Sequence, residues 1–273
     1  MKFLRLSLLL LAFATALTLS ACNSNSPSGN DYVAPAYPAN QNTTWWYNQF
    51  SDTSASGSGK YAQTSTRSEV LYKKDSVIAG KSAILVRGTT TFTVGGTTND
   101  TVRYAVENSS DVQIYLNSIT DLIGNVAGVE FLSGSLTGWQ PYLKPSVGIG
   151  ATYPVITSVP VSARINTNPT GTPVYVDATI TTTINGKVDG KESITVGGKT
   201  YDTVKLTLSI SLTISVSGFP FPVAVPAINA GFWVADRVGI VKQDTPSTTV
   251  TIPLFPSIVI AGTKKELVSI TGN

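Results

Sequence analysis

The segment "KLTLSISLTISVS", Lys205–Ser217, decides the fold, because its apolar and polar residues alternate without a break. A β-strand turns successive side chains to opposite faces, whereas a helix returns to one face only every third or fourth residue. The apolar face consists of Leu206, Leu208, Ile210, Leu212, Ile214 and Val216. At about 3.3 Å per residue, this strand is on the order of 40 Å long. It predicts a large, curved antiparallel sheet or half-barrel with one apolar face.

The rest of the chain is also typical of a mainly β protein. A second alternating segment spans Val174–Ile184, and Asn185-Gly186 and Asp189-Gly190 after it are typical of hairpin turns. Only 13% of the residues are charged, while β-branched and hydroxyl residues are abundant. We expect one or two short helices between Asp111 and Leu143.

The best helix candidate is "NSITDLIGNV", residues 117–126. Ser118 is followed three residues later by Asp121, a spacing that resembles a capping box. Gly124 would end the helix.

One phrase occurs twice in the chain. "TVGGTTNDTVR" begins at Thr93 and "TVGGKTYDTVK" begins at Thr195. In each, the two glycines can take the positive φ angles of a hairpin turn, so each phrase predicts a hairpin. The repetition suggests an internal duplication with halves near 45–145 and 146–273. The alternative is two independent hairpins with similar turn chemistry.

The first residues have the layout of a secretory signal. Basic residues are followed by an apolar run from Leu6 to Leu17, which is short for a membrane span, and then by "LSAC", Leu19–Cys22. This ending resembles the lipobox of bacterial lipoproteins. The resemblance implies that residues 1–21 are removed and that Cys22, the lone cysteine, carries the lipid anchor. The alternative is an ordinary secreted protein.

Residues 22–44 are rich in Pro, Ser and Asn, so we expect a lipidated, disordered tether before a β-rich domain at 45–273. Residue 23 is Asn rather than the Asp that retains enterobacterial lipoproteins at the inner membrane. The resemblance therefore favours the outer membrane, with the membrane itself as a partner through Cys22.

The composition disfavours most catalytic and metal chemistry. The chain has no histidine, which excludes the usual general base and the commonest zinc ligand. No basic run marks a nucleic-acid surface. We expect no enzyme, cofactor or metal; a hydrolase that uses a pair of its carboxylates remains an alternative.

Two apolar segments interrupted by proline, Gly218–Ile228 and Ile252–Gly262, cannot form helices or central strands. They either cap the core of the sheet or line the mouth of an apolar cavity and contact lipid. The residues that would do so are Phe219, Phe221, Val223, Val225, Leu254, Phe255 and Ile258.

The carboxyl-terminal segments "YDTVKLTLSIS" and "GFWVADRVGIVKQDT" look like the closing strands of single-sheet envelope lipoproteins related to LolA, LolB, LprG and LppX. That resemblance implies a curved sheet that holds acyl chains. We therefore expect a non-enzymatic envelope lipoprotein that binds a lipid or other apolar ligand in its concave face. The alternative is a structural scaffold of the envelope.

Overall fold

The computed structural model describes residues 32–54, 59–118, 120–123, 129–133, 136–168, 172–251 and 257–272. The predicted anchor Cys22 and the signal segment lie outside these residues. The chain divides into two compact units, Met1–Val33 and Ala34–Asn273, and the fold described below is that of the second unit.

The second unit is mainly β, as the sequence predicts. The strands of its first half form an antiparallel meander, except for the sixth, which pairs with a later strand. They are β1 (Thr44–Asp52), β2 (Tyr61–Ile78), β3 (Lys81–Phe92), β4 (Thr97–Glu107), β5 (Asp111–Leu116), β6 (Val129–Ser133) and β7 (Gly138–Leu143). The helical elements among the described residues are α2 (Thr120–Ile123) and the 3₁₀ turn η1 (Pro145–Val147).

The later strands include the longest ones. They are β8 (Thr152–Asn166), β9 (Tyr175–Val196), β10 (Lys199–Val216), β11 (Val223–Ala224), β12 (Ile228–Ala235), β13 (Gly239–Thr245), β14 (Thr248–Val250), β15 (Ile258–Ile260) and β16 (Thr263–Thr271). β10 contains the alternating segment that opened the sequence analysis and begins six residues before it, at Lys199 rather than Lys205. The long strand is therefore confirmed.

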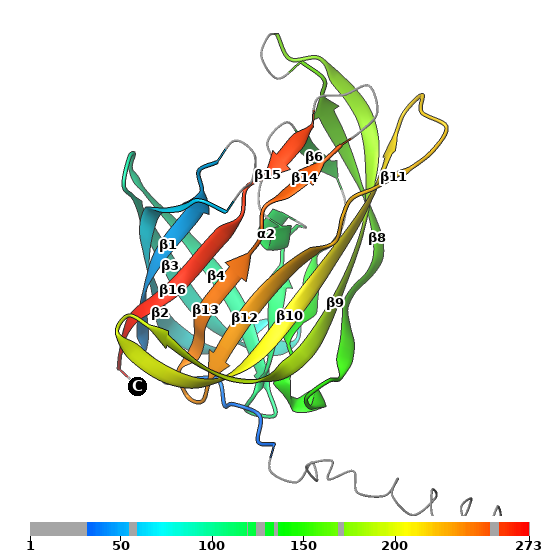
Figure 1. Cartoon of the computed structure of the whole chain (residues 1–273). Coiled ribbons are helices and arrows are strands. Elements are labelled where there is room, and N and C mark those ends of the chain that lie inside the picture. The colour runs from blue at the N-terminus through cyan, green and yellow to red at the C-terminus, as the bar shows by residue number, and fades with distance from the viewer. Residues whose placement is uncertain are drawn as a thin grey trace, which may run out of the picture. The chain divides into compact units, whose positions relative to one another are not determined.

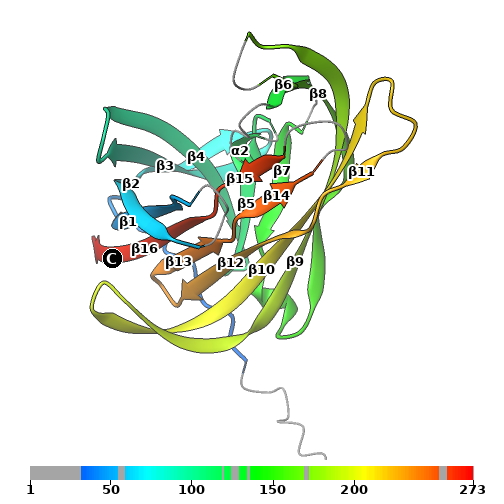
Figure 2. The ribbon, with the colours of Figure 1, turned by 45° about the horizontal axis from the view of Figure 1, so that its top comes forward.

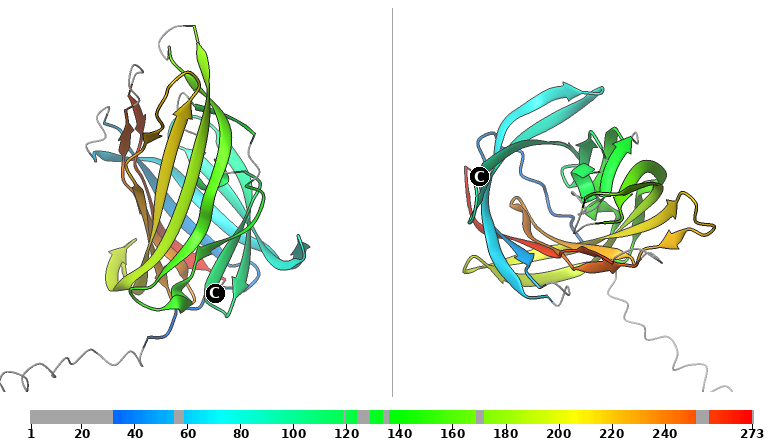
Figure 3. Two further views of the ribbon diagram at one scale, coloured as in Figure 1. Left: turned by 90° about the vertical axis from the view of Figure 1, so that its right-hand side faces the viewer. Right: turned by 90° about the horizontal axis from the view of Figure 1, so that it is seen from above.

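The described strands, apart from β14 and β15, form a single 14-stranded sheet with the order β6-β8-β9-β10-β12-β13-β16-β1-β2-β3-β4-β5-β7, in which β11 pairs with β10 at the side. The last strand, β16, lies between β13 and β1 and joins the two halves of the chain. Viewed from above, the sheet curls into a half-barrel, and its green end strand β7 comes back close to β8 (Figure 3). This confirms the predicted curved antiparallel sheet.

The antiparallel order defines two ends of the sheet. The β9–β10 and β12–β13 turns lie at the lower end in Figure 1, together with the start of β1. The β3–β4 turn, the long β10–β12 connection and the small β14–β15 sheet lie at the upper end, which Figure 2 tilts toward the viewer. The apolar segment Gly218–Ile228 and the described part of the second one, residues 257–262, are therefore at the upper end.

Both repeated phrases form hairpins, as predicted. Gly197 and Gly198 both have positive φ, 55° and 75°, between β9 and β10, whereas only Gly95 has a positive φ in the β3–β4 turn. Because every pairing between these strands is antiparallel, the two turns lie at opposite ends of the sheet. The internal duplication stays a prediction, and these two turns do not occupy equivalent positions.

The expected turns after Val174–Ile184 are wrong, because β9 continues straight through them. Gly186 is buried within the strand, and a Cβ atom there would overlap the ring of Tyr153. Asp189 is the extra residue of a β-bulge, since Lys205 pairs with Gly190 and Leu206 with Val188. Glycine thus marks a close approach and a bulge here rather than turns.

The short helix occurs where it was expected. Asp121 Oδ2 accepts hydrogen bonds from the backbone N–H groups of Asn117 and Ser118, at 2.7 and 3.3 Å. This is the reach-back of a capping box. Gly124 lies outside the described residues.

The compact unit begins before the expected domain start at residue 45. Ala36 accepts a hydrogen bond from the Arg237 N–H and donates one to Asp236 Oδ1, so it is fixed on the β12–β13 turn. Thr43 is fully buried, and the ring of Tyr37 lies 6.0 Å from that of Tyr104. The segment before β1 therefore packs against the lower end of the sheet.

The concave face has two different walls. The apolar wall is the inner face of β8, β9, β10 and β12, where Ile184, Val188 and Leu206 are fully buried. Tyr142 of β7 packs on this wall, with its ring inclined at 75° to that of Phe232 and 5.4 Å between the ring centres. The charged wall is the inner face of β1–β4, β13 and β16, and it holds the candidate site.

Candidate functional site

A cavity of about 380 Å³ lies on the charged wall. Its lining comes from strands far apart in the chain, β1, β2, β4, β13 and β16, with β5, β7 and α2 opposite. The lining groups that matter below are Arg67, Glu69, Asp100, Tyr104, Tyr142, Gln243 and Lys265. This lining is more polar than the apolar cavity that the sequence suggested.

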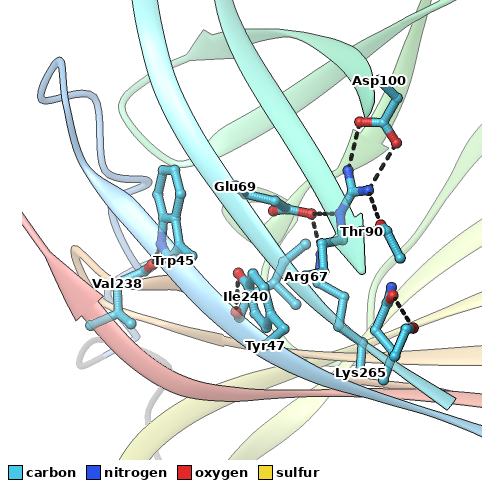
Figure 4. Close-up of polar contacts among 11 residues, drawn as sticks. Trp45, Tyr47, Arg67, Glu69, Thr90, Asp100, Val238, Ile240 and Lys265 are labelled. Carbon is cyan, nitrogen blue, oxygen red and sulfur yellow. Dashed lines mark hydrogen bonds and ion pairs between the residues drawn. The ribbon is translucent and has the colours of Figure 1, made fainter. Parts of the chain in front are cut away.

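Arg67 is the centre of the polar network (Figure 4). Its Nε–H group donates a hydrogen bond to Glu69 Oε1 at 2.7 Å. Its Nη1 and Nη2 groups donate hydrogen bonds to the two carboxylate oxygens of Asp100, each at 2.8 Å. Nη1 also donates to Thr90 Oγ1 at 3.0 Å. Such bidentate, charge-assisted pairing fixes the plane of the guanidinium.

Glycine makes this pair sterically feasible. Gly88 of β3 lies beneath the ion pair, and a Cβ atom there would overlap both the Arg67 guanidinium and the Asp100 carboxylate. The sheet therefore leaves a side-chain position empty so that two charged groups can lie flat across it.

Glu69 joins Arg67 to the C-terminal strand. Lys265 Nζ donates to Glu69 Oε1 at 2.6 Å and lies 4.1 Å from the centre of the Tyr47 ring. Burial acts to raise the pKa of Glu69, but the charges of Lys265 and Arg67 outweigh it and hold this pKa below its ordinary value. Burial also lowers the pKa of Lys265 despite the attraction of Glu69.

Aromatic rings connect the cavity to the lower end and to the apolar wall. Tyr104 lies between Tyr37 and Tyr142, at 6.0 and 6.5 Å between ring centres. Burial raises the pKa of Tyr104 well above its ordinary value, so its hydroxyl is neutral. The Tyr47 hydroxyl donates to the Ile240 carbonyl at 3.0 Å.

Asp52 ties the upper rim together. Its carboxylate accepts from the N–H groups of Ser54 and Gly59 and from the Ser247 hydroxyl, at 2.9, 2.9 and 2.6 Å. These hydrogen bonds lower its pKa. Ser247 precedes β14, so Asp52 connects the β1–β2 loop to the base of the β14–β15 hairpin.

A second hollow, of about 520 Å³, lies where β6 meets the upper ends of β8, β9 and β10. Small side chains such as Ala163, Ala178 and Ser215 line it, together with Leu132 and Val216. It provides space at the upper end of the apolar wall.

The residues predicted to contact lipid have different environments. Phe221 is 78% exposed, whereas Val225 is buried, and Phe219 and Val223 are half-buried. Leu254 and Phe255 lie outside the described residues. Ile258 pairs with Val250 through the backbone of β15. Their role in lipid contact stays a prediction, as does lipidation of Cys22.

Sequence reasoning missed Arg67, Glu69 and Lys265. The sequence does contain a signal for the first two. Arg67 and Glu69 are alternate residues with the buried Leu71, so all three side chains face the same side of β2. Nothing local to Lys265 shows that it meets Glu69, because they are 196 residues apart.

Within the described residues, no group of three or more acidic, cysteine or histidine side chains is placed to hold a metal ion. Helices in the same part of the chain are too short or too polar to cross a membrane.

No protein-family profile matches the sequence, and no curated protein matches it. Solved structures show a distant likeness. A candidate lipoprotein from Parabacteroides distasonis is 11% identical with a TM-score of 0.49, and the match covers 88% of this chain and all of that one. A candidate exported protein with a YmcC-like fold from Bacteroides fragilis has the same identity and coverage and a TM-score of 0.47.

The hypothetical lipoprotein YmcC of Escherichia coli is also similar, with 10% identity, a TM-score of 0.31 and 83% coverage of both chains. At these values the likeness assigns no function to this chain.

Proposed function

We propose that this chain is a lipid-anchored protein of the bacterial cell envelope that binds an amphiphilic lipid without catalysis. The observation that carries the proposal is a polar cavity on one wall of a curled sheet whose other wall is apolar and has the second hollow at its upper end, near the segment Gly218–Ile228. The polar end of the ligand would occupy the cavity, and its apolar part would lie along the upper end. A cavity of this size lies within the range of small-ligand sites.

The anchoring part of the proposal rests on the sequence. The "LSAC" ending supports lipidation of Cys22, and Asn23 favours the outer membrane. Cys22→Ser should move the protein from the membrane fraction to the soluble fraction or leave it uncleaved. A wild-type protein that already fractionates as soluble would contradict the anchor.

The arrangement of the carboxylates supports binding rather than hydrolysis. A glycosidase-type pair needs one carboxyl group with a raised pKa to act as an acid. Glu69 has instead a lowered pKa, and Glu69 and Asp100 are both bound by Arg67. These carboxylates hold the guanidinium in place.

The alternative function is an envelope scaffold. The exposed ring of Phe221 on the β10–β12 connection favours it, because an exposed aromatic side chain is typical of a contact surface. In that case Phe221→Ser would release a protein partner from the envelope and leave bound lipid unchanged.

The proposal is tested by mass spectrometry of an organic extract. The protein from residue 23 onward, which contains the whole compact unit, is purified from the periplasm and then incubated with total envelope lipid. We expect one amphiphile to be retained in stoichiometric amount. A protein that stays empty after this incubation would refute lipid binding and favour the scaffold.

A further inference from the structure

The cavity presents polar groups that the described protein does not use. The hydroxyl groups of Tyr104 and Tyr142 and the side-chain amide of Gln243 line it, and none of them has a hydrogen-bond partner among the described residues. Tyr104 is only 8% exposed. Tyr142 and Gln243 are half-buried, and the three polar groups open into the cavity, where water or the polar atoms of a ligand can bond to them.

Four charged groups of the cavity, in contrast, are already paired. Arg67 is neutralised by Glu69 and Asp100, and Lys265 by Glu69. Arg103 and Asp121 also line the cavity, so three cations face three anions and the lining has no net charge. An ionic ligand would have to break a pair or leave its own charge uncompensated. The lining therefore disfavours a phosphate, carboxylate or ammonium group.

The unpaired groups both donate and accept hydrogen bonds. A phenol hydroxyl and a primary amide each do so, and they match a ligand hydroxyl, which also donates and accepts. The Tyr104 and Tyr142 rings, inclined to one another by only 21°, add an apolar surface for C–H groups.

We infer that the cavity seats an uncharged, hydroxyl-rich group, either glycosyl or polyol, as the polar end of the ligand. This inference rests on the proposed binding function and names the chemical class of the group. Tyr104, Tyr142 and Gln243 bind its hydroxyls, and the Arg67 network is a positioning element that holds β2, β4 and β16 around them. The group can come from a glycolipid or from a free saccharide.

Four probes distinguish these sources. Their binding is measured by isothermal titration calorimetry, at concentrations below the critical micelle concentration. Octyl β-glucoside carries a hydroxyl-rich head, and octylphosphocholine and octanoate carry charged heads on the same chain length. Methyl β-glucoside carries the sugar without the chain. We expect octyl β-glucoside to bind at least tenfold more tightly than either charged probe.

Two variants and a control locate the binding. Tyr104→Phe removes one hydroxyl and keeps the ring, and Gln243→Ala removes the amide. Each should weaken octyl β-glucoside binding about tenfold, since a hydrogen bond contributes about 1 kcal/mol or somewhat more. Gln63→Ala, whose side chain is exposed and bonds to Asn48 on β1, should change nothing.

The outcomes distinguish this inference from the proposed function. Equal binding of all three octyl probes, unaffected by the variants, overturns the inference and leaves amphiphile binding standing. Tighter binding of a charged probe also overturns it. Methyl β-glucoside binding as tightly as octyl β-glucoside supports the inference with a free saccharide as the source and refutes the amphiphile. Absence of binding by all four probes overturns both.

Discussion

Two walls of one curled sheet face the same interior, and they are stabilised by opposite kinds of contact. On the apolar wall, Leu206 and Ile184 are fully buried and contribute by leaving water, at about 25 cal/mol per Å² of buried apolar surface. On the charged wall, the side chains of Arg67 and Glu69 are nearly as buried, at 11% and 10% exposure. Burial there opposes folding and is offset only by correct pairing.

The difference shows which wall tolerates change. Apolar contacts on the first wall have no preferred direction, so apolar side chains of similar volume can replace one another with only a small loss of stability. The charged wall depends on particular atoms at particular distances. A site that must hold a polar group in one orientation is better built on the second kind of wall.

The largest expected effect is a break in the charged wall. Glu69→Ala leaves Lys265 buried without its carboxylate partner, which should lower the free energy of unfolding by about 3–5 kcal/mol in urea denaturation. Glu107→Ala is the matched control, because its ion pair with Lys81 is 44% and 40% exposed and contributes less than about 1 kcal/mol. Equal effects of the two variants would mean that the network is not buried in solution.

A break in the apolar wall should be similar or somewhat smaller. Leu206→Ala removes a fully buried side chain and leaves a cavity, which should lower the free energy of unfolding by about 2–5 kcal/mol. Ser211→Ala, on the exposed face of the same strand, should stay within about 0.5 kcal/mol. A Leu206→Ala effect as small as the control's would contradict the packed interior.

Gly186 tests how closely the apolar wall is packed. Gly186→Ala forces a Cβ atom against the Tyr153 ring and should lower the free energy of unfolding by about 1–3 kcal/mol, measured by thermal or urea unfolding. Gly190→Ala, whose Cβ atom would meet nothing within 4 Å, is the control and should have little effect. If both variants behave alike, Gly186 is not needed for the close approach.

Lowering the pH should reduce the stabilising contribution of the charged wall, and this is the smallest of the expected effects. The folded-state pKa of Glu69 lies below its unfolded value of about 4.3, so its stabilising contribution is present above that pH and is lost as the pH falls through the folded pKa. Melting temperatures between pH 7 and pH 2 should therefore fall more steeply for the wild type than for Glu69→Gln. Parallel curves would show that Glu69 is not the titrating group.

The sequence predicted the apolar wall and missed the charged one, for a physical reason. Strand alternation is a local property, so Leu206 and its neighbours could be placed on one face before any partner was known. The meeting of Glu69 with Lys265 depends on β16 joining β1, which no local pattern encodes. The Asn185-Gly186 pair led to a turn prediction that was wrong. Gly186 instead leaves space for the Tyr153 ring of the neighbouring strand β8.

The position of β16 has a consequence for how the protein is made. Thr44 of β1 pairs with Thr271 of β16, so the first strand finds its outer neighbour only when the last residues have emerged. Contacts of such long sequence separation fold slowly. A chain that emerges N-terminus first holds β1 as an open edge throughout that interval, and an open edge can pair with another copy. The time between the synthesis of β1 and that of β16 is therefore the period in which pairing between copies competes most with folding.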